Sequence, residues 1–237
     1  MNKEIALRYF LSAPHACSYL PQQQASTVFT DPKQDINEQL YSNLAEHGFR
    51  RSGSDFYRPR CQHCQACIPL RIAVQKFQPN RTQRRTWRHM TKISTHIRTA
   101  EFDEEHFNLY CRYLKSRHKD GGMDNPTEES YLSFLSCKDI TTHFIEFRIS
   151  GKLLSVAVVD QLKNSWSAVY TFFDPEMDGL SPGVLAILWE INHCKNKGMD
   201  WLYMGYWIKS CQKMSYKQNY RPCQIYSNKE WQYLTIP

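Results

Sequence analysis

The chain has 237 residues and a mass of 28.1 kDa, which suits one large domain or two small ones, and its 41% of apolar residues can bury a core without disulfides. No run of about 18 apolar residues could span a membrane, and the N-terminus carries charges where a signal peptide is apolar, so we expect a cytoplasmic protein and exclude secreted and membrane-embedded classes. The net charge of +7 divides into +9 in residues 1–100 (15 basic, 6 acidic) and −2 in residues 101–237 (15 basic, 17 acidic), which predicts a polyanion-binding face on the first part.

The first part of the chain contains a predicted helix, a predicted strand and a basic segment. Residues 35–47 carry a helical apolar stripe that ends at Gly48. Residues 68–74 alternate in polarity, as a strand does. Residues 81–98 hold six Lys and Arg side chains around Trp87, and we expect them to form a basic helix that leads into the second part.

In the second part, the spacing of apolar residues changes from a helical repeat to the alternation that is typical of strands. Predicted helices at residues 104–119 and 127–136 precede three predicted strands, at residues 142–149, 153–160 and 165–173. A helix begins at Ser181-Pro182 and ends at Gly198, and a strand at residues 201–204 follows.

This order of elements is typical of the acyl-CoA-dependent N-acetyltransferase (GNAT) fold. We therefore predict an α+β protein with two domains. A small N-terminal α/β domain, residues 1–78, would carry the cysteine cluster and pack on a GNAT-like domain, residues 79–237, with a mostly antiparallel sheet.

Closely spaced thiols form a candidate metal site. Cys61, Cys64 and Cys67 lie three positions apart, a spacing that lets thiolates reach one zinc ion or iron–sulfur cluster from a single loop, and Cys17 is the other nearby candidate. The alternative is that these are reduced cysteines in a tight turn.

The segment 174–183 joins the third strand to the helix at Ser181. In acetyltransferases such a turn binds the cofactor diphosphate, but the carboxylates of Asp174, Glu176 and Asp178 would repel one. The turn can instead direct backbone N–H groups toward an ester carbonyl. Alternatively, it is an ordinary capped helix start with surface acids.

Basic residues alternate with aromatic ones over residues 203–222. Aromatic rings stack on unpaired bases and cations meet phosphates, so this segment suits the single-stranded end of an RNA. The alternative is that the aromatic rings belong to the core. In the first part, forked guanidinium groups suit a carboxylate ligand, unless they are general basic surface: they belong to Arg50, Arg51, Arg58 and Arg71, and we prefer Arg71 or Arg58.

Several ordered motifs resemble one family. They are Gly-Phe-Arg-Arg-Ser-Gly at 48–53, Tyr-Arg-Pro at 57–59, Cys-Ile-Pro at 67–69, Asp-Pro at 174–175, Ser-Pro-Gly at 181–183 and the segment 203–222. Together they resemble the aminoacyl-tRNA–protein transferases of the N-degron pathway. The Cys-Ser-Tyr-Leu-Pro and Cys-x-x-Cys-x-x-Cys-Ile-Pro segments are similar to the bacterial branch, the aspartate/glutamate leucyltransferases.

The resemblance implies transfer of leucine from leucyl-tRNA to proteins with an N-terminal Asp or Glu, which marks them for degradation. No cofactor is required, because the aminoacyl ester is already activated. The residues alone leave arginyl-tRNA open as the donor, since Asp174, Glu176 and Asp178 could line an arginine pocket. An acetyl-CoA-dependent N-acetyltransferase and a non-catalytic zinc-dependent RNA-binding protein are further alternatives.

The motifs suggest a role for each candidate residue. We expect the residues around the reacting ester to be Tyr170, Asp174, Ser181 and Gly183. The N-terminal acid would meet Cys17, Ser18, Tyr19, Arg58 and Arg71. The tRNA would contact Arg81, Arg84, Arg85, Arg88, Lys209, Lys213, Tyr216, Lys217 and Arg221. A metal, if bound, would use Cys17, Cys61, Cys64 and Cys67.

Overall fold

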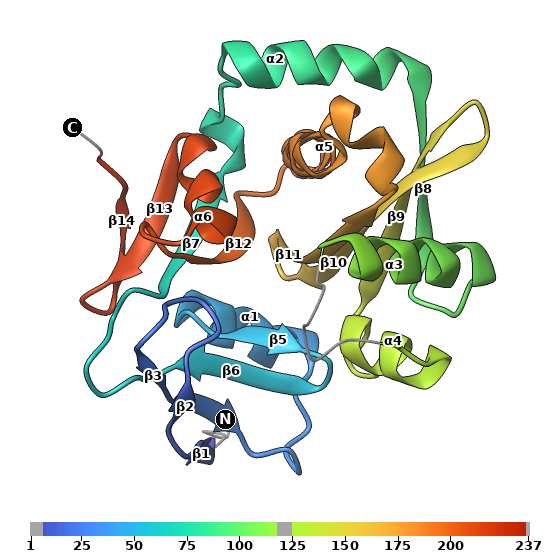
Figure 1. Ribbon diagram of the computed structural model, residues 1–237. Coiled ribbons are helices and arrows are strands. Elements are labelled where there is room, and N and C mark those ends of the chain that lie inside the picture. The colour runs from blue at the N-terminus through green and yellow to red at the C-terminus, as the bar shows by residue number, and fades with distance from the viewer. Residues whose placement is uncertain (1–6, 118–124, 236–237) are drawn as a thin grey trace.

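The computed structural model describes residues 7–117 and 125–235, which form two main β-sheets with helices around them (Figure 1). The helices are α1 (Glu38–Glu46), α2 (Arg81–Trp87), α3 (Glu104–Arg117), α4 (Glu128–Leu135), α5 (Pro182–Asn196) and α6 (Gln212–Ser215). Short 3-10 segments are η1 (Val74–Lys76), η2 (Arg88–Lys92), η3 (Pro175–Leu180) and η4 (Tyr216–Asn219).

The small sheet has the strand order β1-β4-β6-β5. Its strands are β1 (Tyr9–Leu11), β4 (Thr27–Thr30), β5 (Arg50–Ser52) and β6 (Asp55–Pro59), and β2 (His15–Ala16) pairs with β3 (Gln24–Ala25) beside them. The large sheet has the order β14-β13-β7-β12-β11-β10-β9-β8. Its strands are β7 (Ile68–Ala73), β8 (Ile93–Thr99), β9 (Thr142–Ile149), β10 (Lys152–Leu162), β11 (Ser165–Phe173), β12 (Trp201–Trp207), β13 (Cys223–Ser227) and β14 (Glu230–Tyr233).

The large sheet is antiparallel except where β11 pairs with β12. This confirms the expected α+β class with a mostly antiparallel sheet. Strand β7 lies between β12 and β13, so a strand from the first part of the chain joins two strands from the end of the chain. The small sheet itself ends at Pro59, and the division into domains at residue 78 stays a prediction.

Alternation along β10 builds a core on each face of the large sheet. Val156 and Val158 point toward a cluster with α3 and α4, whereas Ala157 and Val159 point toward a cluster with α5. Because neighbouring residues of a strand face opposite sides, a run of apolar residues indicates that both faces are covered. Figure 1 shows α3 and α5 flanking the β10 and β11 region.

The elements expected in the second part are confirmed, with ends shifted by a few residues. The helix expected at 104–119 is α3, and its last two residues lie outside the described ranges. The basic helix expected at 81–98 is only partly correct. Residues 81–87 are helical, but 93–99 form β8, because Ile93, Thr95 and Ile97 place β-branched side chains on one side of a strand.

A buried ion pair fastens the small sheet to the large one. Arg51 of β5 donates from Nε to Asp160 Oδ2 of β10 (2.8 Å) and from Nη2 to Asp160 Oδ1, and both side chains are fully buried. Arg51 also donates to the Leu135 carbonyl oxygen (3.0 Å) and to Thr142 Oγ1 (3.2 Å). This network fixes β5 against the large sheet.

We predict that Asp160→Asn destabilises the fold by about 3–5 kcal/mol, because it leaves the Arg51 charge buried without a counter-ion. Urea unfolding followed by circular dichroism measures the change. Asp139→Asn, at an exposed position, is the control and should change the unfolding free energy by less than about 0.5 kcal/mol. Equal curves for the two variants would contradict the anchoring role.

Candidate active site

Strands β11 and β12 run together for only a short distance and then part. Residues 165–167 pair with residues 201–203, but β11 continues to Phe173 and β12 to Trp207 without further pairing between them. We call the unpaired facing edges, residues 168–173 and 204–207, the strand opening. Backbone N–H and C=O groups on such edges need other partners.

Arg50 of β5 enters the strand opening and donates hydrogen bonds to unpaired backbone carbonyl groups of β11. Its Nη2 donates to the carbonyl oxygens of Ala168 (2.6 Å) and Val169 (3.2 Å) on β11. On the facing strand, Gly205 has a φ of +73°, and a Cβ at this position would overlap the Arg50 guanidinium. A glycine here therefore gives the guanidinium its place between the strands.

Lys217 of η4 donates a hydrogen bond to the facing strand, β12. Its Nζ donates to the Tyr206 carbonyl oxygen of β12 (2.7 Å), and the residue is only 7% exposed. Burial, and next the positive charge of Arg50, lower the pKa of Lys217 to about 7. Two basic side chains thus share the opening, and within the described ranges neither forms an ion pair with Asp or Glu.

Tyrosines and a thiol surround the two cations. The Tyr206 hydroxyl donates to the carbonyl oxygens of Gly48 (3.0 Å) and Tyr57 (3.1 Å). Tyr19 lies close enough to Tyr57, Cys67 and Arg50 for their charges to influence its pKa, which burial raises. Burial also raises the pKa of Cys67 to about 12, so its thiol is uncharged at neutral pH and leaves the cations uncompensated.

The four expected metal-binding thiols lie near one another. Cys17, Cys61 and Cys64 each add to the rise in the pKa of Cys67, after burial itself. Over residues 7–117 and 125–235, however, no group of three or more His, Cys, Asp or Glu side chains is arranged to hold a metal ion. A metal at these thiols therefore stays a prediction.

Of the residues expected around the reacting ester, Tyr170 directly follows Val169, whose carbonyl oxygen accepts a hydrogen bond from Arg50, and the other three lie further along the chain. The Tyr170 ring packs among Tyr110, Tyr113 and Phe134 on the α3 and α4 side, and its hydroxyl is buried with no partner among the described residues. Asp174 lies six residues beyond Ala168, roughly 20 Å along an extended strand.

Asp174 is committed to structural contacts. It is 2% exposed, accepts a hydrogen bond from the Glu176 N–H (3.1 Å) and pairs with Lys152 (2.8 Å). Burial opposes its ionisation, but the hydrogen bond from Lys152 and the charges of Lys152 and Arg112 prevail, so the pKa of Asp174 is lowered. Such a carboxylate is a weak proton acceptor. Ser181, at φ +55°, and Gly183 form the start of α5 beyond this pair.

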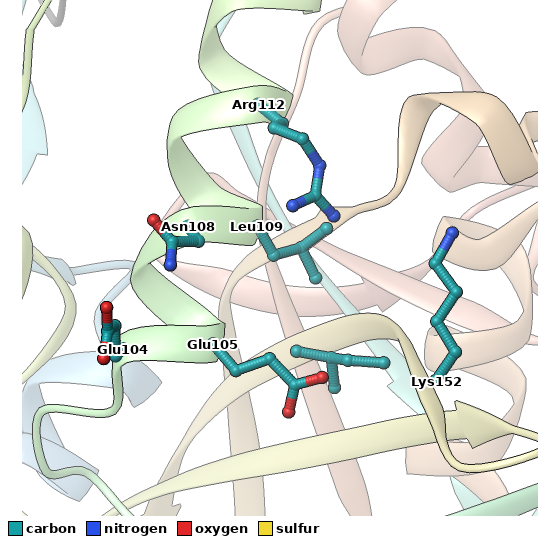
Figure 2. Close-up of a pocket in the computed structure, with 7 residues that line it drawn as sticks. Glu104, Glu105, Asn108, Leu109, Arg112 and Lys152 are labelled. Atoms are coloured by element: carbon teal, nitrogen blue, oxygen red, sulfur yellow. The ribbon is translucent and has the colours of Figure 1, made fainter.

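A hollow of about 410 Å³ lies beside this pair, between α3 and β10 (Figure 2). It is lined by Glu104, Glu105, Asn108, Leu109, Arg112, Lys152 and Leu153. Several of its charged side chains already form ion pairs, since Arg112 and Lys152 both pair with Asp174 and Glu105 pairs with Arg148. We assign it no ligand.

The residues expected at the N-terminal acid divide into two groups. Arg71 is 7% exposed, its Nη1 pairs with Glu46 (2.9 Å), and its guanidinium lies between the indole rings of Trp201 and Trp231. It has no free face for a ligand.

The other members lie nearer the opening. Arg58 donates to the His47 carbonyl oxygen (2.7 Å), and its charge, like that of Arg50, influences the pKa of Tyr206. The exposed Tyr19 is coupled to Arg50, and Cys17 and Ser18 precede it in the same loop.

Most residues expected at the tRNA are exposed. Arg81, Arg84, Arg85 and Arg88 line a hollow of about 940 Å³ beside Trp87 on α2. Exposed side chains after β12 are Lys209, Lys213 and Arg221, and Tyr216 is 41% exposed. Lys217 differs, because its ammonium group is buried at the Tyr206 carbonyl instead of facing a phosphate.

Two residues were not chosen as expected site residues, although Arg50 was one of the four arginines considered for a carboxylate ligand. Arg50 looks like its neighbour Arg51 in sequence, and only the distant Gly205 distinguishes its surroundings. Glu190 of α5 is fully buried, and neither carboxylate oxygen has a partner among the described residues. The sequence feature that could have indicated Glu190 is an acidic residue on the apolar stripe formed by Ile187, Ile191 and Cys194.

Comparisons with known proteins agree over nearly the whole chain. Residues 15–85 match a family model described as arginine-tRNA-protein transferase, N terminus, and residues 105–227 match the model of its C terminus. The chain is 48% identical over 231 residues to the aspartate/glutamate leucyltransferase of Alcanivorax borkumensis, covering 98% of this chain and 96% of the relative. It is 46% identical over 235 residues to that of Pseudomonas aeruginosa PAO1, covering 99% and 100%.

Among solved structures, L-PGS from Bacillus licheniformis matches with a TM-score of 0.50 and 12% identity, covering 72% of this chain and 59% of that chain. This likeness supports the fold alone. Within the part of the chain that the structure describes, no helix is both long and apolar enough to cross a membrane.

We predict that Gly205→Ala destabilises the protein by about 1–3 kcal/mol, since alanine must adopt a positive φ and displace the Arg50 guanidinium. Chemical denaturation measures this. Gly179→Ala, with open space around its Cβ, is the matched control and should change stability by less than about 0.5 kcal/mol. If Gly205→Ala leaves the free energy of unfolding unchanged, the Arg50 guanidinium does not depend on the space that the missing Cβ of Gly205 provides.

Proposed function

The chain belongs to the arginine-tRNA-protein transferase family, and we propose that it transfers leucine from leucyl-tRNA to the α-amine of proteins that begin with Asp or Glu. It is an aminoacyltransferase, as its curated relatives are. We further propose that the new N-terminal leucine marks the product for degradation, and that the reaction occurs in the cytoplasm, where charged tRNA is available.

The observation that carries this proposal is the Arg50 guanidinium at the strand opening, next to the buried amine of Lys217. Arg50 and Lys217 bind backbone carbonyl oxygens, but no carboxylate of the described residues neutralises them. Buried charges without partners are costly unless a ligand pairs with them. The side chain of an N-terminal Asp or Glu is such a ligand, and a guanidinium binds carboxylates with directed hydrogen bonds.

Binding of the acid at Arg50 would bring the acceptor's α-amine into the opening. An α-amine has an ordinary pKa of about 7.7–8.0, so an appreciable fraction is free base at neutral pH. Its nitrogen attacks the ester carbonyl carbon, the C–N bond forms, and the bond to the tRNA ribose oxygen breaks. The proton that the nitrogen loses passes to the ribose oxygen, which leaves as a hydroxyl group. Positioning and backbone N–H groups along the opening can supply much of the acceleration.

The arginines of α2 would hold the tRNA. Arg81, Arg84, Arg85 and Arg88 present four positive charges around one hollow, and Trp87 adds a ring there. Phosphates supply the complementary charge, and the exposed Lys209, Lys213 and Arg221 extend the basic surface after β12.

The curated relatives, which are named aspartate/glutamate leucyltransferases, favour leucine over arginine as the transferred residue. An arginine pocket needs free carboxylates, but Asp174 pairs with Lys152 and Asp178 pairs with Arg117 (2.7 Å). Both lie toward the far end of β11 from Arg50. An apolar donor side chain needs no such charge.

We predict that Arg50→Gln lowers kcat/KM for a peptide beginning with Asp about 100-fold and abolishes the preference for Asp over Asn, because the forked cation is lost. Transfer of radiolabelled leucine from leucyl-tRNA to the two peptides measures both effects. Lys163→Gln, at an exposed turn, is the charge-matched control and should retain rate and preference. If the variant loses tRNA affinity and keeps the preference for Asp, Arg50 contacts RNA and not the acceptor.

We also predict that Arg84→Ala combined with Arg85→Ala weakens tRNA binding and reduces the slope of log K against log salt by about one unit per lost phosphate contact. Filter binding over a salt series measures the slope. Lys115→Ala, on exposed α3 surface, should leave the slope unchanged. An unaltered slope in the double variant would place the tRNA on another face.

A further inference from the structure

One face of the small sheet carries aromatic rings that follow Arg50 from strand to strand. Arg50 of β5 pairs in register with Tyr57 of β6. Tyr57 pairs with Phe29 of β4, which in turn pairs with Phe10 of β1. Directly paired residues of neighbouring strands point to the same face of a sheet. Phe10, Phe29 and Tyr57 therefore lie in line with Arg50 on one face, and we call these three residues the ring row.

The ring row leads from the strand opening to the outer edge of the small sheet. The ring centroids of Phe29 and Tyr57 lie 6.1 Å apart, and that of Tyr57 lies 6.0 Å from Tyr206 of β12, at the opening. Phe29 and Tyr57 are half-buried, and Phe10 is 54% exposed. Figure 1 shows β5 near the large sheet and β1 on the side of the small sheet away from it. A ligand bound at the opening can therefore continue along accessible rings.

The opposite face of the small sheet faces the core. There Phe56 of β6 and Val28 of β4 pack in a cluster with Tyr41 of α1. Within the described residues, no core cluster includes a member of the ring row. Contiguous apolar side chains that remain accessible outside the core are typical of an interaction surface.

The charge of this face suits a polypeptide better than a nucleic acid. Alternation along the strands places Ser52, Thr27, Asp55 and Pro59 on the same face as the ring row. Arg50 and Asp55 are therefore the only charged strand residues on this face of the described sheet. A surface that stacks bases is usually accompanied by several cations that meet the phosphates. Rings without such cations fit apolar side chains and the neutral backbone of a peptide.

We propose that the ring row binds the residues that follow the N-terminal acid of the acceptor protein, an inference that rests on the proposed function. When the first side chain pairs with Arg50, the rest of the acceptor has to leave the opening, and the row begins at that arginine. Three strand spacings separate Arg50 from Phe10, about 14 Å, which an extended chain crosses in about four residues. The residues directly after the acid therefore lie extended across the small sheet.

This assignment defines the acceptor more closely than its first residue does. The first residue supplies the charge that pairs with Arg50, and the next few supply apolar area that covers Phe29 and Phe10. An acceptor whose second residue already belongs to a packed helix or strand cannot extend across the row. The preferred substrates are thus proteins whose N-terminal Asp or Glu begins an unfolded segment with apolar side chains.

The first experiment follows leucine transfer from leucyl-tRNA to amidated peptides of two, four, six and eight residues. Each peptide begins with Asp, followed by Leu alternating with Thr. We expect kcat/KM to rise about 10-fold from two residues to six, mainly through KM, and then to level off, because the added apolar contact ends at Phe10. A second series with Ser in place of Leu should stay near the two-residue value. Equal kcat/KM values at all lengths in the Leu series would overturn the inference without any variant.

The second experiment repeats the Leu series with Phe10→Ser, which should fold because the ring is exposed. We expect this variant to lower kcat/KM of the eight-residue peptide about 5-fold. The two-residue peptide cannot reach β1 and should react as it does with wild type. Leu11→Ser is the matched control, since Leu11 lies on the same strand, is 62% exposed and points to the opposite face. It should keep the full dependence on length.

Other occupants of the ring row would give different results. If Phe10→Ser weakens binding of leucyl-tRNA and keeps the dependence on peptide length, the rings contact RNA. If sedimentation shows a dimer that Phe10→Ser dissociates while the length dependence persists, a second copy of the chain covers the row. Either result, or an equal loss in Leu11→Ser, overturns the inference. Leucine transfer to the two-residue peptide tests the proposed function itself, and it can succeed while the ring row fails.

Discussion

The guanidinium of Arg50 occupies a gap between two parallel strands that have ceased to pair, and the rest of the site is arranged around it. The next residue, Arg51, faces the other way, into the buried ion pair with Asp160. Because consecutive strand residues point to opposite sides, one short strand both anchors the small sheet and delivers a charge to the opening. The stability of the fold and the geometry of the site are thereby linked through neighbouring residues.

Charge is distributed unevenly across this region. Arg50 and Lys217 lie together at the opening, and no Asp or Glu of the described residues pairs with either. Asp174, by contrast, is paired with Lys152. The basic part of the site is therefore open to an acidic ligand, and this is where we propose that the N-terminal acid of the acceptor binds.

The elements of the second part could be predicted from sequence because their signals are local. The double-sided apolar run of β10 and the Ser-Pro start of α5 need no information from elsewhere in the chain. The small sheet could not be predicted, since its strands are only 3 to 5 residues long. The site was harder to predict than the fold. The place of Arg50 depends on a glycine far along the chain, and the contacts of Arg71 with two indole rings and Glu46 cannot be inferred from spacing.

The position of β7 bears on how the molecule is made. This strand leaves the ribosome early, yet its neighbours β12 and β13 are among the last segments to be synthesised. Until they arrive, both edges of β7 lack hydrogen-bonding partners, and Lys217 has not joined Arg50. An incomplete chain therefore lacks both the finished large sheet and the opening where we propose that the acceptor binds.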